Sequence, residues 1–200
     1  MLTNNSLLKI RKYAFDNSEK DNIHGFSHVE RVYDLSIKLG EKLNANIKLL
    51  KISALLHDIG RIDENNDKLR RNHAQISAEK ALAFLTSQNF NISNNDIKSI
   101  IHCIEAHSFS NKIFPETLEA KILSDADKLD ALGAIGLFRT ISFTVLNKDG
   151  IKEVIEHLEN KILKLKDQLY LDVSKEIARE RHKIILDFYK EIKNEINHIK

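Results

Sequence analysis

The sequence predicts an all-α fold. Its 200 residues include one Pro, six Gly and no Trp, while 42% of them are hydrophobic and 30% are charged. So few chain breakers favour long helices over the turn-rich strands of a sandwich or barrel. Apolar residues also recur at helical spacing along most of the chain. No repeat or linker divides the sequence, so we expect a single domain over residues 1–200 with one sizeable core.

Apolar stripes locate the first helices. A helix over 27–43 is expected, with Ser27 as its N-cap and His28 at the head of its apolar stripe. The next helix begins near residue 47 and ends at Gly60. It is apolar nearly all round, so we expect it to be central. Residues 61–72 are polar and are predicted to form an exposed loop.

Further helices are expected in the rest of the chain. Their predicted ranges are 73–88, 93–107, 116–136, 151–166 and 174–199. Ser93 and Asp96 match a capping box at the start of the second of these. Residues 140–146 are rich in β-branched side chains and fit either a short strand or the end of the preceding helix, and residues 147–150 are predicted to form a turn.

Charge and composition exclude several partner classes. The net charge of +2, from 31 basic and 29 acidic residues, gives no global field that would attract nucleic acid or an anionic membrane. No segment approaches the ~20 apolar residues of a membrane span, and the first residues lack a secretory signal. The single cysteine, Cys103, fits a reducing compartment. We therefore expect a cytoplasmic protein with no membrane or nucleic-acid partner.

Ligand-type residues interrupt the apolar stripes of three predicted helices. They are His28, His57 with Asp58, and Asp125. A carboxylate removed from water needs a strong partner or must be protonated. A divalent cation is such a partner, because imidazole nitrogen and carboxylate oxygen are ligands of Mn, Fe, Co, Ni and Zn. Each residue also has a plainer explanation, as a hydrogen-bonded core histidine or as an aspartate whose helical phase is misjudged.

The order of these residues matches a known motif. The chain resembles the HD superfamily of metal-dependent phosphohydrolases, whose metal motif is H…HD…D on a helical bundle. The resemblance rests on three elements in this order: His28, the segment 54–60 (ALLHDIG) and the segment 124–127 (SDAD). Finer matches resemble one branch in particular, the small stand-alone bacterial HD hydrolases of the YedJ and YpgQ type. They are the segments 24–28, 106–110 and 125–136, with Arg139. The resemblance covers a metal-site core over about 24–140, followed by C-terminal helices over about 151–199.

The resemblance implies an enzyme and its cofactor. It implies that His28, His57, Asp58 and Asp125 bind one divalent ion, with Mn²⁺ favoured over Mg²⁺, Ni²⁺, Co²⁺, Fe²⁺ or Zn²⁺. The implied reaction is attack of a metal-bound water on the phosphorus of a phosphate ester or anhydride. A nucleoside or deoxynucleoside triphosphate, cleaved to release pyrophosphate, is the leading substrate. We expect the enzyme to be a monomer or a homodimer.

Other side chains are expected to contact the substrate. Asp58 has a second, catalytic role as the residue that orients the water, and charge on the phosphoryl oxygens calls for the cations Arg31 and Lys128. We assign His73, His107 and Arg139 to substrate binding. In some two-metal HD phosphodiesterases, histidines at comparable places hold a second ion, so that role stays open for His73 and His107.

The resemblance leaves alternatives open. Members of this branch often continue HDIG with an acidic and basic pair, whereas here the motif runs into residues 61–64 (RIDE). Basic residues of the following loop, Arg61, Lys68, Arg70 and Arg71, could supply positive charge, but none matches the family pattern residue by residue. The alternative functions are a non-catalytic module that senses a nucleotide or binds a protein, and a phosphodiesterase, although the chain has no GYP tripeptide.

Overall fold

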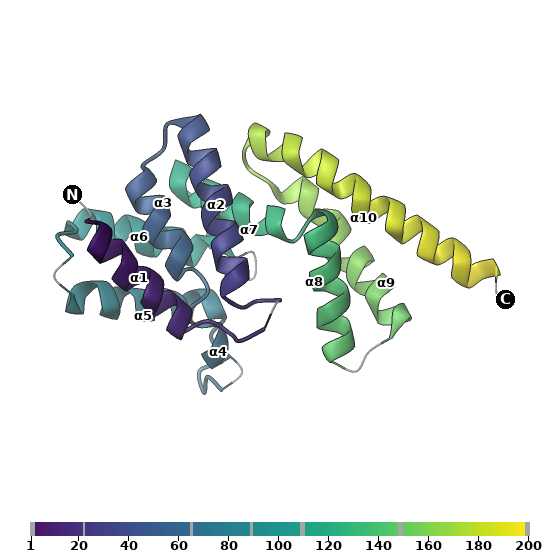
Figure 1. Ribbon diagram of the computed structural model, residues 1–200, viewed down its shortest axis with the longest axis horizontal. Helices are drawn as coiled ribbons and strands as arrows, with labels where there is room; N and C mark the ends of the chain where they lie inside the picture. Colours follow the sequence, from purple (N-terminus) through teal and green to yellow (C-terminus); the bar gives the residue numbers. More distant parts are fainter. Residues whose placement is uncertain are drawn as a thin grey trace. The chain divides into compact units, whose positions relative to one another are not determined.

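The computed structural model describes residues 3–21, 23–64, 66–88, 90–108, 111–147 and 150–198 (Figure 1). It confirms the all-α class: the β pairing among these residues amounts to one isolated bridge between Glu19 and Gly25. In this described part no single helix is long and apolar enough to cross a membrane, and the consecutive helices α7 (Leu118–Asp130) and α8 (Gly133–Leu146) meet that criterion only when taken together across a bend.

The chain divides into two compact units, Met1–Ala126 and Asp127–Lys200. The first unit contains α1 (Asn4–Asp16), α2 (Phe26–Leu43), α3 (Ile47–Leu56), α4 (Arg61–Glu64), α5 (His73–Ser87), α6 (Asn94–His107) and most of α7 (Leu118–Asp130). The second contains α8 (Gly133–Leu146), α9 (Ile151–Asn160), the 3₁₀ helix η2 (Ile162–Gln168) and α10 (Asp172–His198). The expectation of one domain over residues 1–200 stays a prediction.

Helix α3 is the centre of the first unit, as its nearly all-round apolar surface predicts. It packs against α1, α2, α5 and α6, and Leu50, Ile52 and Leu55 are fully buried in it. Asn46 caps its start by accepting a hydrogen bond from the Leu49 amide at 3.3 Å. A helix buried on every side has a fixed position, so its C-terminal end can place side chains accurately.

The start of α2 differs from the sequence prediction. The N-cap is Gly25, and Ser27 lies inside the first turn, so the predicted Ser27 cap is wrong. The reason lies in the preceding loop. One carboxylate oxygen of Asp21 accepts backbone hydrogen bonds from Ile23, His24 and Gly25 at 2.7–3.0 Å, and this ordered turn places the N-cap two residues before the predicted one.

Helix α1 lies outside the predicted helical ranges. Its start is nevertheless marked by Thr3, whose hydroxyl accepts a hydrogen bond from the Ser6 amide at 3.1 Å. Only Ile10 and Ala14 of this helix are buried. Short, mostly polar helices of this kind are stabilised by packing against a neighbour, here α3, and not by their own periodicity.

The helix predicted over 116–136 is broken. Helix α7 ends at Asp130, Leu132 is extended, and α8 begins at Gly133, whose φ of +77° favours glycine. Residues 140–146 belong to α8, so the strand alternative is wrong. The region 151–166 also divides, into α9 and η2, and residues 148 and 149 of the predicted turn lie outside the described residues.

Replacing Leu55 by Ala tests the central place of α3. We expect Leu55→Ala to lower the free energy of unfolding by about 3 kcal/mol, because a buried leucine loses its contacts and leaves a cavity. Urea denaturation followed by circular dichroism measures the change. Leu82→Ala on α5, where the leucine is 44% exposed, is the control and should cost less than about 0.5 kcal/mol. Equal losses in the two variants would contradict a core centred on α3.

Candidate metal centre

Three predicted ligands meet at one point of the first unit. His28 lies in the first turn of α2, His57 is the C-cap of α3, and Asp58 follows it in the turn before α4. All three are buried. The two Nε2 atoms of His28 and His57 are 3.4 Å apart. Oδ2 of Asp58 lies 3.6 Å from the Nε2 atom of His28 and 3.8 Å from that of His57.

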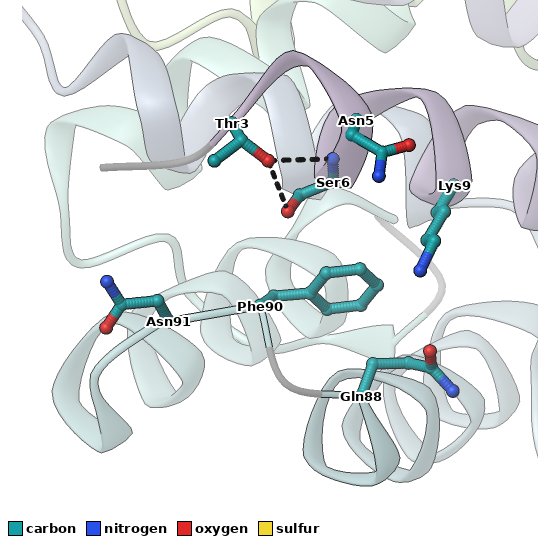
Figure 2. Close-up of a pocket in the computed structure, with 7 residues that line it drawn as sticks. All are labelled: Thr3, Asn5, Ser6, Lys9, Gln88, Phe90 and Asn91. Carbon is teal, nitrogen blue, oxygen red and sulfur yellow. Dashed lines mark hydrogen bonds between the residues drawn. The ribbon is translucent and has the colours of Figure 1, made fainter.

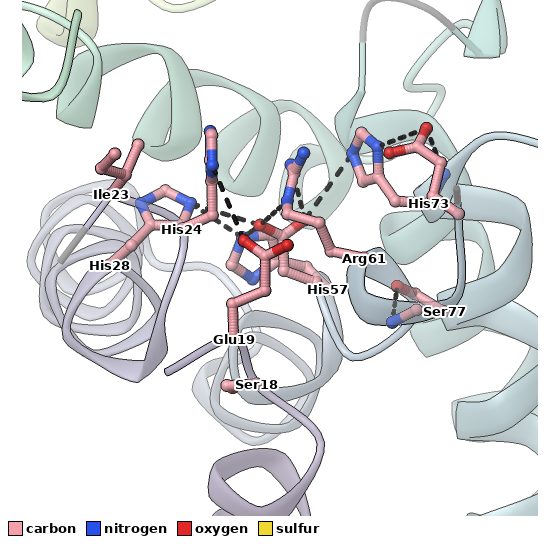
Figure 3. A network of polar contacts seen from close by, with 12 residues as sticks. Ser18, Glu19, Ile23, His24, His28, His57, Arg61, His73 and Ser77 are labelled. Carbon is pink, nitrogen blue, oxygen red and sulfur yellow. Dashed lines mark hydrogen bonds and ion pairs between the residues drawn. The ribbon is translucent and has the colours of Figure 1, made fainter. Parts of the chain in front are cut away.

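Two more histidines approach the same carboxylate from its other oxygen. His73 is the first residue of α5 and His107 is the last residue of α6. Their Nε2 atoms lie 3.6 Å and 3.7 Å from Oδ1 of Asp58. Figure 3 shows His28, His57 and His73 arranged around this point. The structure therefore brings together residues predicted as metal ligands and residues predicted as substrate contacts.

The hydrogen bonds of the rings show which nitrogen carries the proton. Nδ1 of His57 lies 2.8 Å from the Ala54 carbonyl oxygen, and Nδ1 of His107 lies 2.6 Å from that of Ile104. A carbonyl oxygen only accepts, so both Nδ1 atoms donate. In the neutral ring, Nε2 then offers a lone pair. Two acceptors, an imidazole lone pair and a carboxylate oxygen, thus face each other across the site.

The charge of Asp58 depends on its neighbours. Burial by itself raises the pKa of this carboxyl, but the Arg61 guanidinium and, in their protonated form, the surrounding imidazoles outweigh burial and hold the pKa well below its usual range. Arg61 donates from Nε to Oδ2 at 2.9 Å and from Nη2 to Oδ1 at 3.0 Å. Burial lowers the pKa of His73 more than Asp58 raises it, which favours a neutral ring.

These residues fit a divalent metal ion. Ligand atoms from His57, Asp58 and His107 all lie within 4.8 Å of one another. Nε2 of His107 is buried and makes no hydrogen bond. A buried acceptor without a donor is costly, and a metal ion is the partner that accepts its lone pair. The predicted fourth ligand, Asp125, is fully buried on α7 within the same unit, and its place in a metal site stays a prediction.

Contacts between the α3–α4 turn and α5 fix the carboxylate relative to His73. The Gly60 amide donates to the Ser77 hydroxyl at 2.9 Å. A Cβ on Gly60 would lie 2.5 Å from the Ser77 backbone nitrogen, so only glycine allows this approach. Glu64 of α4 accepts from the His73 amide at 3.0 Å, and its Oε1 lies 3.3 Å from Nδ1 of the ring.

Sequence reasoning missed the roles of Ser77 and Glu64, and it named Arg61 only as one of several possible sources of positive charge. The segment 61–72 was expected to be an exposed loop, yet it begins with the short helix α4, which carries both Arg61 and Glu64 to the site. A signal was available for Ser77, since it follows His73 by four residues and therefore lies on the same helix face. No spacing rule identifies Glu64, whose contact depends on the fold of the turn.

The predicted cations lie in different parts of the chain. Arg31 is partly buried on α2, three residues after His28. Lys128 and Arg139 belong to the second unit. There, Nζ of Lys128 lies 5.4 Å from the ring centroid of Tyr170, and Arg139 donates to the buried Asp130 at 2.7 Å. The Arg139 contact joins α8 to the end of α7, and its predicted role in substrate binding stays a prediction.

A separate surface hollow of about 350 Å³ lies between the start of α1 and the α5–α6 connection (Figure 2). Its lining is Thr3, Asn5, Ser6, Lys9, Gln88, Phe90 and Asn91. Figure 2 shows the Thr3 hydroxyl occupied by the Ser6 amide and hydroxyl, which caps α1. The lining contains no histidine or carboxylate, so the hollow does not offer the chemistry of the histidine cluster.

Comparisons with known proteins agree with this geometry. The family model of the HD domain matches residues 25–132, a range that contains all four predicted metal ligands. The chain is 31% identical over 182 residues to the uncharacterized protein YpgQ of Bacillus subtilis, covering 86% of this chain and 84% of YpgQ.

Solved structures are similar over almost the whole chain. The crystal structure of Bacillus subtilis YpgQ in complex with ADP matches with a TM-score of 0.73 and 28% identity, and covers 94% of each chain. An HD-superfamily hydrolase from Bacillus thuringiensis matches with a TM-score of 0.72 and 26% identity, and covers 96% of this chain and 97% of its own.

The close approach at Gly60 predicts a sensitive position. Gly60→Ala should lower the free energy of unfolding by about 1–3 kcal/mol, because the added methyl group forces the turn away from α5. The same shift moves Asp58 away from His73 and should weaken binding of Mn²⁺. Thermal melting and isothermal titration measure the two effects. Gly150→Ala, where a Cβ meets nothing closer than 3.5 Å, is the control: it should leave binding of Mn²⁺ unchanged and cost less than about 1 kcal/mol, the loss expected at the N-cap of α9.

Proposed function

The chain belongs to the HD-domain family of metal-dependent phosphohydrolases, and from that premise we propose that its substrate is a nucleotide. The leading reaction is pyrophosphohydrolysis of a nucleoside or deoxynucleoside triphosphate, which gives a nucleoside monophosphate and pyrophosphate. The observation that carries the proposal is the Asp58 carboxylate with four imidazole Nε2 atoms 3.6–3.8 Å from its oxygens. The nucleotide is supported by the similarity to YpgQ, which was crystallised with ADP.

The proposed ligands of the ion are His28, His57, Asp58 and Asp125, and Mn²⁺ is the proposed metal. When bound, a divalent ion supplies a Lewis acid that polarises the phosphoryl oxygen and lowers the pKa of water. The protein supplies rigidity. The Ala54 carbonyl fixes the ring of His57, and burial on all sides keeps the end of α3 in place.

The remaining side chains act on the substrate in this proposal. Asp58 orients the attacking water in addition to its role as a ligand. Arg31, Lys128 and Arg139 donate to the non-bridging phosphate oxygens, on which charge accumulates in the transition state. The line of attack is opposite the leaving pyrophosphate, so these cations also hold the nucleotide in the reactive orientation.

A specific observation supports a different role for His73 and His107. Because Nδ1 of His107 donates to Ile104, its Nε2 can donate to a phosphate oxygen only if the ring is an imidazolium. A neutral ring instead offers a lone pair, as a metal ligand does. The second candidate function is therefore a phosphodiesterase with two ions, the second held by His73, His107 and Oδ1 of Asp58. A metal content of two ions per chain would favour it over the one-ion reaction.

Removing a ligand should abolish both metal binding and catalysis. We expect His57→Ala and Asp58→Asn to lose bound Mn²⁺ and to lower phosphate release from nucleotides, assayed with added pyrophosphatase, by at least about a hundredfold. The helical content should be retained. Metal analysis, circular dichroism and a screen over nucleotides with Mn²⁺, Mg²⁺, Ni²⁺ and Co²⁺ give the three readouts. His157→Ala on α9, a histidine of the second unit, is the control.

The outcomes separate the alternatives. A wild-type protein that holds its ion but leaves every nucleotide intact contradicts the substrate proposal. Unchanged melting temperature and unchanged ADP binding after chelation would instead support a non-catalytic binding module, in which the histidines have a structural role only.

Removing a predicted cation should weaken catalysis on the substrate and leave metal binding unchanged. Lys128→Gln should lower kcat/KM by about tenfold to a hundredfold with unchanged metal content, because a charge-assisted contact to phosphate is lost. Steady-state kinetics and metal analysis test this. Lys121→Gln removes the same charge from an earlier turn of the same helix and should leave kcat/KM within about twofold. A loss of metal from the Lys128 variant would contradict a role limited to the substrate.

A further inference from the structure

Arg61 occupies a special position next to the proposed metal ligands. It stands three residues after Asp58 and binds both oxygens of that carboxylate, through Nε at 2.9 Å and Nη2 at 3.0 Å. The Asp58 side chain is 1% exposed and that of Arg61 is 21% exposed. A bidentate guanidinium contact of this kind is a strong and oriented ion pair, and here it lies on a buried carboxylate.

The surroundings of Asp58 explain why a cation is needed there. The imidazoles of His57 and His107 offer lone pairs toward it, since their Nδ1 protons are committed to the carbonyl groups of Ala54 and Ile104. Neutral imidazole lone pairs do not compensate a buried negative charge. Arg61 supplies the compensating charge from the same short segment of chain.

A divalent ion would compensate the same charge through the same two oxygens. Oδ2 of Asp58 faces His28 and His57, and Oδ1 faces the other histidine pair. An ion on either side therefore shares the carboxylate with the guanidinium, and the two positive charges repel each other in a buried site. We propose that Arg61 is an internal cation that competes with the divalent ion for Asp58. This inference rests on the proposed metal centre.

The attachment of α4 lets the guanidinium leave without moving the helix. Asp63 pairs with Lys80 of α5 at 2.7 Å, and Glu64 accepts from the His73 amide at 3.0 Å. Both contacts hold α4 on α5, so rotation of the Arg61 side chain is sufficient. Partial exposure of that side chain gives it room to rotate toward solvent.

Glu19 provides an anionic neighbour on the other side of Arg61. Burial and Asp21 raise the pKa of Glu19, and the positive charge of Arg61 acts in the opposite direction. Figure 3 shows the Glu19 carboxylate beside Arg61. A guanidinium that leaves Asp58 therefore remains next to a carboxylate, which lowers the cost of its release.

The proposal is tested by measuring stability and ion affinity in Arg61→Gln. In protein depleted of metal by chelation, the melting temperature should fall by at least about 3 °C, because a buried carboxylate loses its counter-ion. In protein saturated with Mn²⁺ it should stay within about 1 °C of wild type. By thermodynamic linkage, the Kd for Mn²⁺ should then decrease by about tenfold. Differential scanning calorimetry and isothermal titration with Mn²⁺ alone give these values without an activity assay.

Two further variants complete the test. Arg61→Lys keeps the charge but not the two-pronged contact, so its Kd should lie between those of wild type and Arg61→Gln. Lys48→Gln breaks a remote, partly buried ion pair with Asp96 and should lower the melting temperature equally with and without Mn²⁺, leaving the Kd unchanged.

Other results would overturn the inference. Equal destabilisation of Arg61→Gln with and without Mn²⁺ would show a purely structural ion pair, and a weaker Kd would show that Arg61 supports the ion. If the wild-type protein takes up no Mn²⁺ at all, the proposed metal centre fails. If it binds Mn²⁺ and Arg61→Gln binds no more tightly, the competition alone fails.

Discussion

A single buried carboxylate determines how the first unit is arranged around its site. Asp58 has lost almost all contact with water, and its negative charge must be balanced by groups brought from several helices. The turn that carries it is fixed by α3 before it and by α5 beside it. His28, His73 and His107 reach it from α2, α5 and α6. The hydrophobic core thus fixes the positions of the helix ends that carry the side chains of the site.

The apolar helix α3 shows how core packing becomes site geometry. Its buried leucine and isoleucine side chains leave it no freedom to rotate or slide against its neighbours. His57 continues the helix at its C-cap, and its ring is locked by the Ala54 carbonyl one turn earlier. The orientation of a ligand is therefore set by an ordinary helical backbone group, and the position of the whole helix by the core.

Much of this arrangement could be predicted from the sequence. The helix containing His28 and the central helix follow from apolar periodicity, although the predicted end of the central helix at Gly60 lies four residues past its observed end at Leu56. The polar residues on those stripes identified the region of the site. The break after Asp130 was not predictable from periodicity, because the apolar pattern continues through it and only the positive φ of Gly133 marks the change of direction. Apolar periodicity does not reveal a helix break when the same spacing of apolar residues continues from one helix into the next.

The least predictable contacts belong to α4. Arg61 and Glu64 lie in a polar segment without periodicity, so nothing in the sequence indicates that one contacts Asp58 and the other His73. The protonation of the histidine rings was equally hidden, since it depends on carbonyl groups one turn earlier. Sequence spacing identifies the residues that can act as ligands. Their protonation and charge depend on hydrogen bonds and ion pairs that form only in the folded chain.

The charge balance at Asp58 also bears on how a polyanion could approach the site. The net charge of the chain is only +2, so attraction for a polyphosphate must be local. The pair formed by Asp58 and Arg61 is neutral as a unit, and the lowered pKa of His73 favours a neutral ring beside it. A divalent ion adds two positive charges to that balance and leaves Arg61 available to other anions. Exchange of one cation for another on a single carboxylate would thus change a neutral site into one that attracts phosphate.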